Sequence, residues 1–317
     1  MEYIILIISL VGIVFGADYL VAGAVSVARK FKVSDFVIGA AIVGIGTSMP
    51  ELVVSFIGAL NGNPDVAIGN VVGSNIFNVL GILGLTAMFF PIVVSKTNMK
   101  FELPVCIVVS LLLTLLVFNC FTGGAPVISR PDGLILLVCF GIFMWYSFYR
   151  DRKSAKAAEE APAEEDNTPL WLALVKVVGG LAVLITSCDF FVDNAVLIAK
   201  SFGVNDAFIS LTLIACGTSL PELAASVAAA LKKNTQLALG NVIGSNIFNI
   251  TWILGLSSQV MPLNSSGITA ADYCVMIAAA IIPMILGVKG KIGRWSGAFM
   301  FVCFIAYNYY LITSQIA

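Results

Sequence analysis

Two short segments of this sequence place a glutamate directly after a proline in otherwise apolar surroundings: GTSMPEL at residues 46–52 and GTSLPEL at residues 217–223. Pro50 and Pro221 lack an N–H group and clash with the carbonyl group four residues earlier, so a helix through either motif is expected to unwind over its Gly-Thr-Ser portion. The backbone carbonyls released there, the neighbouring hydroxyls and the carboxylate are oxygen ligands, which hard cations such as Ca2+ and Na+ prefer. Each motif therefore predicts part of a cation site built on a broken helix.

A second motif also occurs twice and adds further side-chain oxygens. GNVVGSNIFN spans residues 69–78 and GNVIGSNIFN spans residues 240–249. On a helix, a spacing of four residues puts the serine hydroxyl and the last asparagine amide of the motif on one face. The asparagine directly after the serine, Asn75 or Asn246, lies off that face, and the sequence leaves open whether it is a ligand or structural. The candidate ligands from both motifs are Thr47, Ser48, Glu51, Ser74 and Asn78 in the first copies and Thr218, Ser219, Glu222, Ser245 and Asn249 in the second.

The composition places these motifs in a membrane. The chain of 317 residues is 59% hydrophobic and 11% charged, with a mean hydropathy of +1.01, which leaves too little polar surface for a soluble globule. A helix that crosses about 30 Å of hydrocarbon needs roughly 20 apolar residues. Ten apolar runs meet this length, near residues 3–27, 36–60, 66–90, 102–120, 133–149, 170–198, 207–231, 236–260, 271–288 and 295–315. The expected fold class is an all-α integral membrane protein with ten transmembrane helices.

The two halves of the chain are copies of each other. Adding 171 to a residue number relates residues 18–91 to residues 189–262 without a gap, and the GN motif with the six residues after it is identical at 12 of 16 positions. Each half holds five spans, an odd number, so the second copy enters the membrane from the opposite side and the repeats are inverted. Spans two and seven are then broken near the bilayer midplane, where Glu51 and Glu222 face each other. A buried carboxylate there costs at least a few kcal/mol, so an unused pair would be hard to retain.

Basic residues are distributed unevenly between alternate loops. Of the 17 Lys and Arg residues, 14 fall in loops on one side of the predicted membrane; Arg130 and Lys200 fall on the other, and Lys176 lies inside a span. The positive-inside rule puts the basic side in the cytoplasm and both termini outside it.

A charged, Ala-rich stretch at residues 150–169 is predicted to be a cytoplasmic linker. It separates a first repeat at 1–149 from a second repeat at 170–317. The chain has no histidine, which excludes a His relay or His metal ligand, and its seven cysteines lack the spacing of a disulfide framework or a CxxC metal site. We expect no cofactor, no nucleic-acid binding and no obligate protein partner.

The motifs resemble those of a known family. GTSMPE with GNVVGSNIFN is similar to the first alpha-repeat of the cation/Ca2+ exchanger superfamily, specifically the prokaryotic Na+/Ca2+ exchangers, and GTSLPE with GNVIGSNIFN is similar to the second. The likeness covers both repeats and the ten-span layout, which is nearly the whole chain. It implies a multi-pass protein of the inner (plasma) membrane that exchanges Na+, three per cycle, for one Ca2+ by alternating access. It also implies that spans one and six slide against the other spans.

The resemblance further implies a shared midplane site of four cation positions. The two motif glutamates and the backbone carbonyls of the motif threonines would hold Ca2+, Na+ would use the same carboxylates, and the last asparagine of each GN motif would line the middle position. The flanking Na+ positions would add oxygens from Ser48, Ser74, Ser219, Ser245, the threonine hydroxyls and the carbonyls of Gly44 and Ala215. One departure from the family pattern concerns K+: the K+-dependent relatives carry Asp at the position of Asn249, so this chain is expected to be K+-independent.

Three other functions could use some of these features. An H+/Ca2+ antiporter would need the glutamates alone, whereas the surrounding Ser, Thr and Asn oxygens favour Na+. A membrane enzyme could use two facing carboxylates to activate water, but the sequence has no intramembrane-protease GxGD motif, no histidine and no separate nucleophile. A channel is disfavoured because inverted repeats with paired broken helices are typical of alternating access.

Overall fold

The computed structural model describes residues 2–119, 126–157, 168–201, 217–265 and 267–316, and the long elements in these ranges are all helices. Short π-helical turns interrupt several of them and carry the label η. In the first half the helical elements are α1 (Glu2–Phe31), α2 (Asp35–Ile38), η1 (Gly39–Gly44), α3 (Ile45–Thr47), α4 (Met49–Leu60), α5 (Pro64–Ile76), η2 (Phe77–Leu83), α6 (Gly84–Phe89), η3 (Asn98–Glu102), α7 (Leu103–Val117) and α8 (Arg130–Ala157). In the second half they are α9 (Leu170–Ser201), α12 (Leu220–Leu231), α13 (Thr235–Phe248), η5 (Asn249–Ile253), α14 (Leu254–Val260), α15 (Ala270–Leu286), the 3-10 turn η6 (Gly287–Lys289) and α16 (Arg294–Ile316).

Within the described ranges, eight helices are long and apolar enough to cross a membrane. A ninth span forms if the bent pair Asp35–Thr47 and Met49–Leu60 is counted as one, and its two parts meet at an angle of 48°. The chain is therefore an all-α membrane protein with about eight or nine apolar spans. Of the predicted run 207–231, the part before residue 217 lies outside the described residues, and the rest contains α12.

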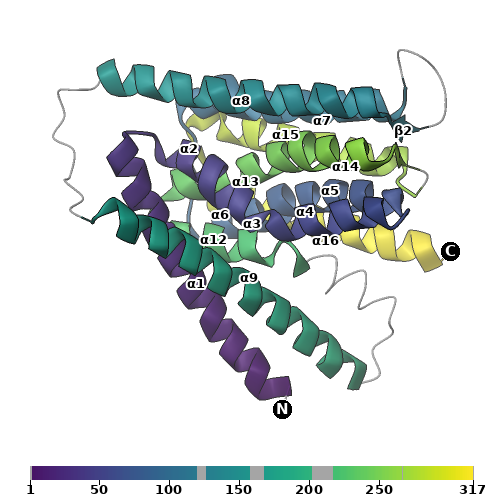
Figure 1. The fold of residues 1–317 in the computed structure, drawn as a ribbon, viewed down its shortest axis with the longest axis horizontal. Helices are drawn as coiled ribbons and strands as arrows, with labels where there is room; N and C mark the ends of the chain where they lie inside the picture. The colour runs from purple at the N-terminus through teal and green to yellow at the C-terminus, as the bar shows by residue number, and fades with distance from the viewer. Residues whose placement is uncertain (1, 120–125, 158–167, 202–216, 266, 317) are drawn as a thin grey trace.

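The spans that carry the two GN motifs form the centre of the bundle. In the span Thr235–Val260, 94% of the apolar window is buried inside the protein, against 11% for Arg294–Thr313 at the periphery. Helices α1 and α9 pack side by side along their length and extend together beyond the other helices (Figure 1). The bundle thus has a buried polar centre, peripheral helices and one projecting helix pair.

Two short antiparallel strand pairs join the halves. Strand β1 (Ile92–Val93) pairs with β4 (Lys291–Ile292), and β2 (Val127–Ile128) pairs with β3 (Leu263–Asn264). Helix α15 has 17 residues and runs between β3 and β4, so the two pairs are separated by about 25 Å of helix. Each end of that helix is therefore closed by a strand pair drawn from both halves.

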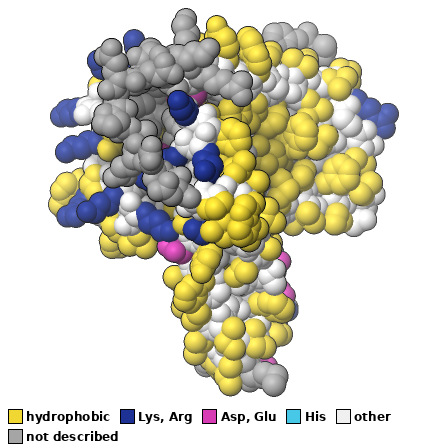
Figure 2. Space-filling view, turned by 60° about the vertical axis from the view of Figure 1, so that its left-hand side comes forward, with side chains coloured by type: hydrophobic (Ala, Val, Ile, Leu, Met, Phe, Trp, Pro, Cys, Tyr) yellow, Lys and Arg dark blue, Asp and Glu magenta, His cyan; other side chains and the backbone are white. Residues whose placement is uncertain are grey.

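The surface separates apolar sides from a basic end. Figure 2 shows Lys and Arg side chains gathered at the end of the bundle where α8 ends and α9 begins, and hydrophobic side chains over the flanks and the projecting pair. Large apolar residues are exposed on those flanks, such as Val178 at 67% and Val302 at 61%, as expected for a lipid-facing surface.

Helix α8 continues to Ala157, so the first part of the predicted linker is helical. Asp151 in this extension accepts hydrogen bonds from the backbone N–H of Ser34 at 2.7 Å and from its hydroxyl at 2.6 Å. These bonds fix the end of α8 to the start of α2.

Candidate cation site

Both motif glutamates lie in the first turn of a helix that starts after a break. The motif serines have backbone angles of φ −82° and ψ 11° at Ser48 and φ −93° and ψ 9° at Ser219, and α4 and α12 begin at the next residue. Proline follows in the first turn, where its missing N–H breaks no helical bond. Glu51 and Glu222 are fully buried, and the helix N-termini behind them favour negative charge.

The two glutamates are held by each other's motif. The Ser48 hydroxyl donates to Oε1 of Glu222 at 2.8 Å, and the Ser219 hydroxyl donates to Oε1 of Glu51 at 2.7 Å. Oε2 of each glutamate has no hydrogen-bond partner among the described residues. Each carboxylate is thus fixed through one oxygen and keeps the other available.

Four asparagines cross-link the two spans that carry the GN motifs: Asn75 in α5, Asn78 in η2, Asn246 in α13 and Asn249 in η5. The amide of Asn75 donates to the backbone carbonyl of Asn246 at 3.2 Å, and that of Asn246 donates to the carbonyl of Asn75 at 3.0 Å. Oδ1 of Asn246 accepts from the side-chain amide of Asn78 at 3.1 Å, and Oδ1 of Asn75 accepts from that of Asn249 at 3.2 Å. These bonds orient the side chains of Asn78 and Asn249 through their NH2 groups. The Oδ1 atom of each has no hydrogen-bond partner among the described residues.

Several unpaired buried oxygen atoms belong to the predicted ligands and make this region a candidate site for a hard cation. They include Oε2 of both glutamates and Oδ1 of Asn78 and Asn249, with the hydroxyls of Ser74 and Thr218 nearby in the same motifs. Leaving so many buried acceptors unpaired is costly in a folded protein. The donor set is oxygen only, and no group of three or more His, Cys, Asp or Glu residues occurs in the described part of the chain. Oxygen ligands with two carboxylates suit Ca2+ or Na+ rather than a transition metal.

The family model for the sodium/calcium exchanger protein matches residues 1–149 and 172–313. The chain belongs to this cation/Ca2+ exchanger family. It is 39% identical to a putative antiporter, CaxA, of Alkalimonas amylolytica over 98% of both chains, and 33% identical to the sodium/calcium exchanger MaX1 of Methanosarcina acetivorans over 96% of this chain and 97% of the relative. A solved structure of the sodium-calcium exchanger NCX_Mj, soaked with Na+ and Sr2+, matches with a TM-score of 0.82 at 33% identity over 96% of this chain and 97% of that one.

Hydrogen bonds between the two halves link further predicted ligands. Thr47 donates from its hydroxyl toward the carbonyl of Gly44 at 3.4 Å and toward Oδ1 of Asn241 at 3.3 Å, and Ser245 donates to the same Gly44 carbonyl at 3.2 Å. Ser74 lies on α5, one helical turn before Asn78 in η2. Ala215 lies outside the described residues.

Sequence reasoning missed two asparagines that shape the site. Asn70 donates to the backbone carbonyl of Glu51 at 3.1 Å and to the Ser55 hydroxyl at 2.9 Å. Asn241 makes the same two bonds in the other half, at 3.1 Å to the Glu222 carbonyl and 2.9 Å to the hydroxyl at position 226. The repeat offered a signal for both: each asparagine is the second residue of a GN motif, and the serine to which it donates also occurs at equivalent positions in the two halves. They fix the first turns of α4 and α12, and so the positions of the carboxylates.

Three π-helical turns also border the site. Gly44 ends η1, Asn78 lies in η2 and Asn249 begins η5. A π-turn inserts a residue into a helix and re-aims its side chains, and such turns occur mostly at functional sites. The asparagine oxygens owe their direction in part to η2 and η5.

Proposed function

We propose that this chain is a secondary antiporter that exchanges Na+ for Ca2+ by alternating access. The observation that carries the proposal is the pair of buried glutamates, each fixed by the opposite motif through one oxygen and each with its other oxygen unpaired in the described chain. Two ionised carboxylates match the charge of one Ca2+, and neither neutralises it alone. Membership of the exchanger family supports the same pair of ions.

The ligand assignment follows from these oxygens. Ca2+ would lie between the two glutamates and take the backbone carbonyls of Thr47 and Thr218 as further ligands, and the last asparagines of the GN motifs would line the middle position. Na+ would use the same carboxylates. Its flanking positions would add Ser48, Ser74, Ser219, Ser245, the hydroxyls of Thr47 and Thr218, and the carbonyls of Gly44 and Ala215.

The architecture proposed with this function has ten spans in two inverted five-helix repeats, 1–149 and 170–317. The linker 150–169 would lie in the cytoplasm and the termini outside it, in the inner (plasma) membrane. The pairing of each half with the other in both strand pairs, and the basic side chains at one end of the bundle, support this arrangement. Helices α1 and α9 would be the pair that slides against the rest.

We further propose a stoichiometry of three Na+ per Ca2+ without K+. With two carboxylates in the site, one Ca2+ gives a neutral loaded carrier, whereas three Na+ give a net charge of +1. The Na+ limb then moves charge through the field, at about 2.3 kcal/mol per elementary charge per 100 mV. The amide at Asn249 leaves no third carboxylate for K+.

Radioactive Ca2+ uptake into proteoliposomes tests the function. We expect an outward Na+ gradient to drive uptake, and a proton gradient alone to give none. Replacing K+ by choline on both sides at a fixed membrane potential should leave the rate unchanged. In separate vesicles, a potential imposed with valinomycin should change it, inside-negative potentials speeding Ca2+ exit coupled to Na+ entry. Uptake driven by protons without Na+ would overturn the proposal, and a rate indifferent to potential would indicate two Na+ per Ca2+.

A further inference from the structure

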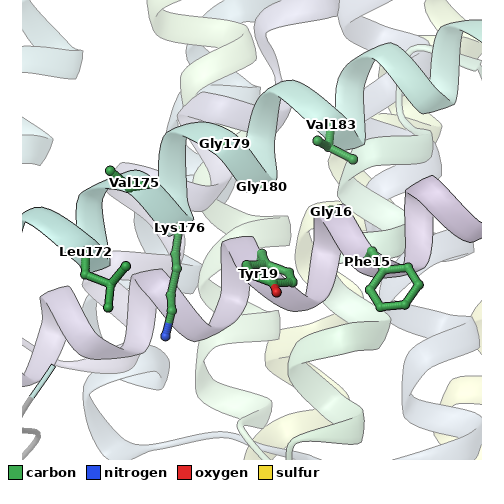
Figure 3. A pocket seen from close by; sticks show the side chains of 9 residues that line it. All are labelled: Phe15, Gly16, Tyr19, Leu172, Val175, Lys176, Gly179, Gly180 and Val183. Carbon is green, nitrogen blue, oxygen red and sulfur yellow. The ribbon is translucent and has the colours of Figure 1, made fainter.

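A groove of about 430 Å3 lies between α1 and α9, and none of the candidate cation ligands lines it. Figure 3 shows it bordered by Phe15 and Tyr19 from α1 and by Leu172, Lys176 and Val183 from α9. The groove exists because the two helices touch through glycines: a Cβ at Gly180 would lie 2.5 Å from the backbone nitrogen of Leu20. Next to this contact, a Cβ at Gly179 would meet nothing within 4 Å, so Gly179 faces the open space of the groove.

Lys176 is the charged residue of this groove. It lies six residues after Leu170, where α9 begins, and so about 9 Å along the helix. Its ammonium group forms no ion pair with a carboxylate in the described part of the chain. A lysine at this depth can extend its stem along apolar surface and place its charge at the level of the lipid headgroups. In Figure 3 the side chain leaves α9 and passes across α1 in this way.

We propose that the groove binds one anionic phospholipid molecule, with its phosphate on Lys176 and an acyl chain along Gly179 and Val183. Charge complementarity supports this occupant, because a cation at the mouth of an otherwise apolar groove matches a negative headgroup on an apolar tail. The surroundings are also those of a lipid: Val175 and Val178 beside the groove are 57% and 67% exposed. The same end of the bundle carries the gathered basic side chains, which attract anionic lipids to this leaflet.

The repeat register shows that the groove is specific to one half. The positions that correspond to Lys176 and Gly179 in the first half are Ile5 and Ile8, which supply neither a cation nor an open space. A generic need for lipid contact would not account for this difference. The bound lipid touches both α1 and α9, so it binds the two helices together as one body.

Native mass spectrometry of the purified full chain tests this inference without measuring transport. The delipidated protein is titrated with dioleoyl phosphatidylglycerol and, in parallel, with dioleoyl phosphatidylcholine. We expect the first phosphatidylglycerol to bind about fivefold more tightly, the effect of one lysine charge at a membrane surface. Lys176→Gln should remove this preference, and the matched charge change Lys96→Gln, at an exposed position between β1 and η3 on the predicted basic side, should keep it.

A second variant tests the acyl chain separately from the charge. The Cβ of Gly179→Leu would meet no atom within 4 Å, and Gly179 lines the groove, so this variant should weaken the binding of both lipids while leaving the thermal stability of the lipid-free protein unchanged. Equal affinity for the two lipids in the unmodified chain, or a preference that survives Lys176→Gln, would overturn the proposal. Displacement of the lipid by sn-glycerol 3-phosphate at equal concentration would also overturn it, because the site would then recognise a phosphate without a chain.

Discussion

The two halves of the chain present the same polar groups to the centre of the bundle, and they differ at its ends. At the centre, the serine–glutamate bonds measure 2.8 and 2.7 Å, and the bonds from Asn70 and Asn241 to the glutamate carbonyls both measure 3.1 Å. The serine–glutamate bonds cross between the halves, whereas each asparagine bond lies within one half, so both kinds of contact are repeated.

Toward the ends, the contacts of the two halves differ. Glu102, directly before α7, is buried and pairs with Arg150, whereas near the start of α15 the hydroxyl of the buried Tyr273 hydrogen-bonds with that of Ser265 at 2.6 Å. The comparison teaches that the halves match closely in the side chains that would bind the same ion and differ in contacts nearer the ends. Residues at the ends need not match between the halves, so they can contribute differently to stability, to lipid contacts and to the balance between conformations.

The largest expected effect comes from breaking the symmetric centre. Glu51→Gln and Glu222→Gln should each lower Na+-driven Ca2+ uptake by more than about 100-fold, because each removes half of the negative charge opposite Ca2+ and leaves a net positive charge in a buried site when the ion binds. The measurement is the initial uptake rate in proteoliposomes with matched protein content. The two variants should be equally impaired; a mild effect in either one would mean that Ca2+ is not shared.

Glu102→Gln is the matched control for these variants, since Glu102 is a buried glutamate outside the site. It should lower the unfolding temperature, because Arg150 loses its partner, and it should retain exchange. Loss of exchange in a stably folded Glu102→Gln protein would show that sensitivity to buried carboxylates is not specific to the centre.

A smaller effect is expected from the asparagines that orient the ligands. Asn75→Ala and Asn246→Ala each remove an acceptor for the amide of Asn249 or Asn78, at a cost of about 1–2 kcal/mol, or roughly tenfold in apparent ion affinity. Concentration dependence of Ca2+ uptake gives this value. Asn98→Ala is the control, because Asn98 is equally buried and bonds to the backbone N–H of Ser95 far from the site. Equal affinity losses in all three variants would indicate a global effect.

The sequence predicted the helix break at the centre better than it predicted the contacts that orient the ligand side chains. The break before Glu51 is confirmed by the 48° bend at Ser48, because a proline without an N–H group acts on the helix directly. The expected unwinding of Gly46 and Thr47 is wrong, since both remain helical in α3 and only Ser48 leaves the helical conformation. The repeat strengthened the prediction of a break, since the same local pattern occurs twice. Predicted spans one, three and eight also agree with α1 and with Pro64–Phe89 and Thr235–Val260.

The π-turns and the asparagine network could not be predicted in the same way. A π-turn depends on contacts with neighbouring helices, and no residue type in η2 or η5 marks it. The structural bonds of Asn75 and Asn246 follow from the crossing of α5 and α13, which brings residues 171 positions apart within 3.2 Å. The extension of α8 to Ala157 was missed because its charged residues read as linker composition.

The smallest predicted effect concerns a divergent pair that connects α1 to the end of α12. Asp18 and Lys232 form an ion pair at 2.7 Å, and Lys232 also donates to the Asp18 backbone carbonyl at 2.8 Å. By the 171 register the equivalent pair would be Asp189 and Asn61, which has no cation. If α1 and α9 slide against the other helices, this pair stabilises the conformation described here and has no charged equivalent in the opposite one.

Partly exposed ion pairs contribute about 0.2–1 kcal/mol, so Asp18→Asn and Lys232→Gln should each shift the ratio of apparent Ca2+ affinities on the two sides of the membrane by up to about fivefold. Asp189→Asn should leave that ratio unchanged, and the double variant should shift it no further than either single one, because both remove the same interaction. The shift should also shrink at high ionic strength, since the charges are accessible to salt. An equal shift in Asp189→Asn, or additive shifts in the double variant, would show that Asp18 and Lys232 act separately and that the difference between the two ends does not set the balance between conformations.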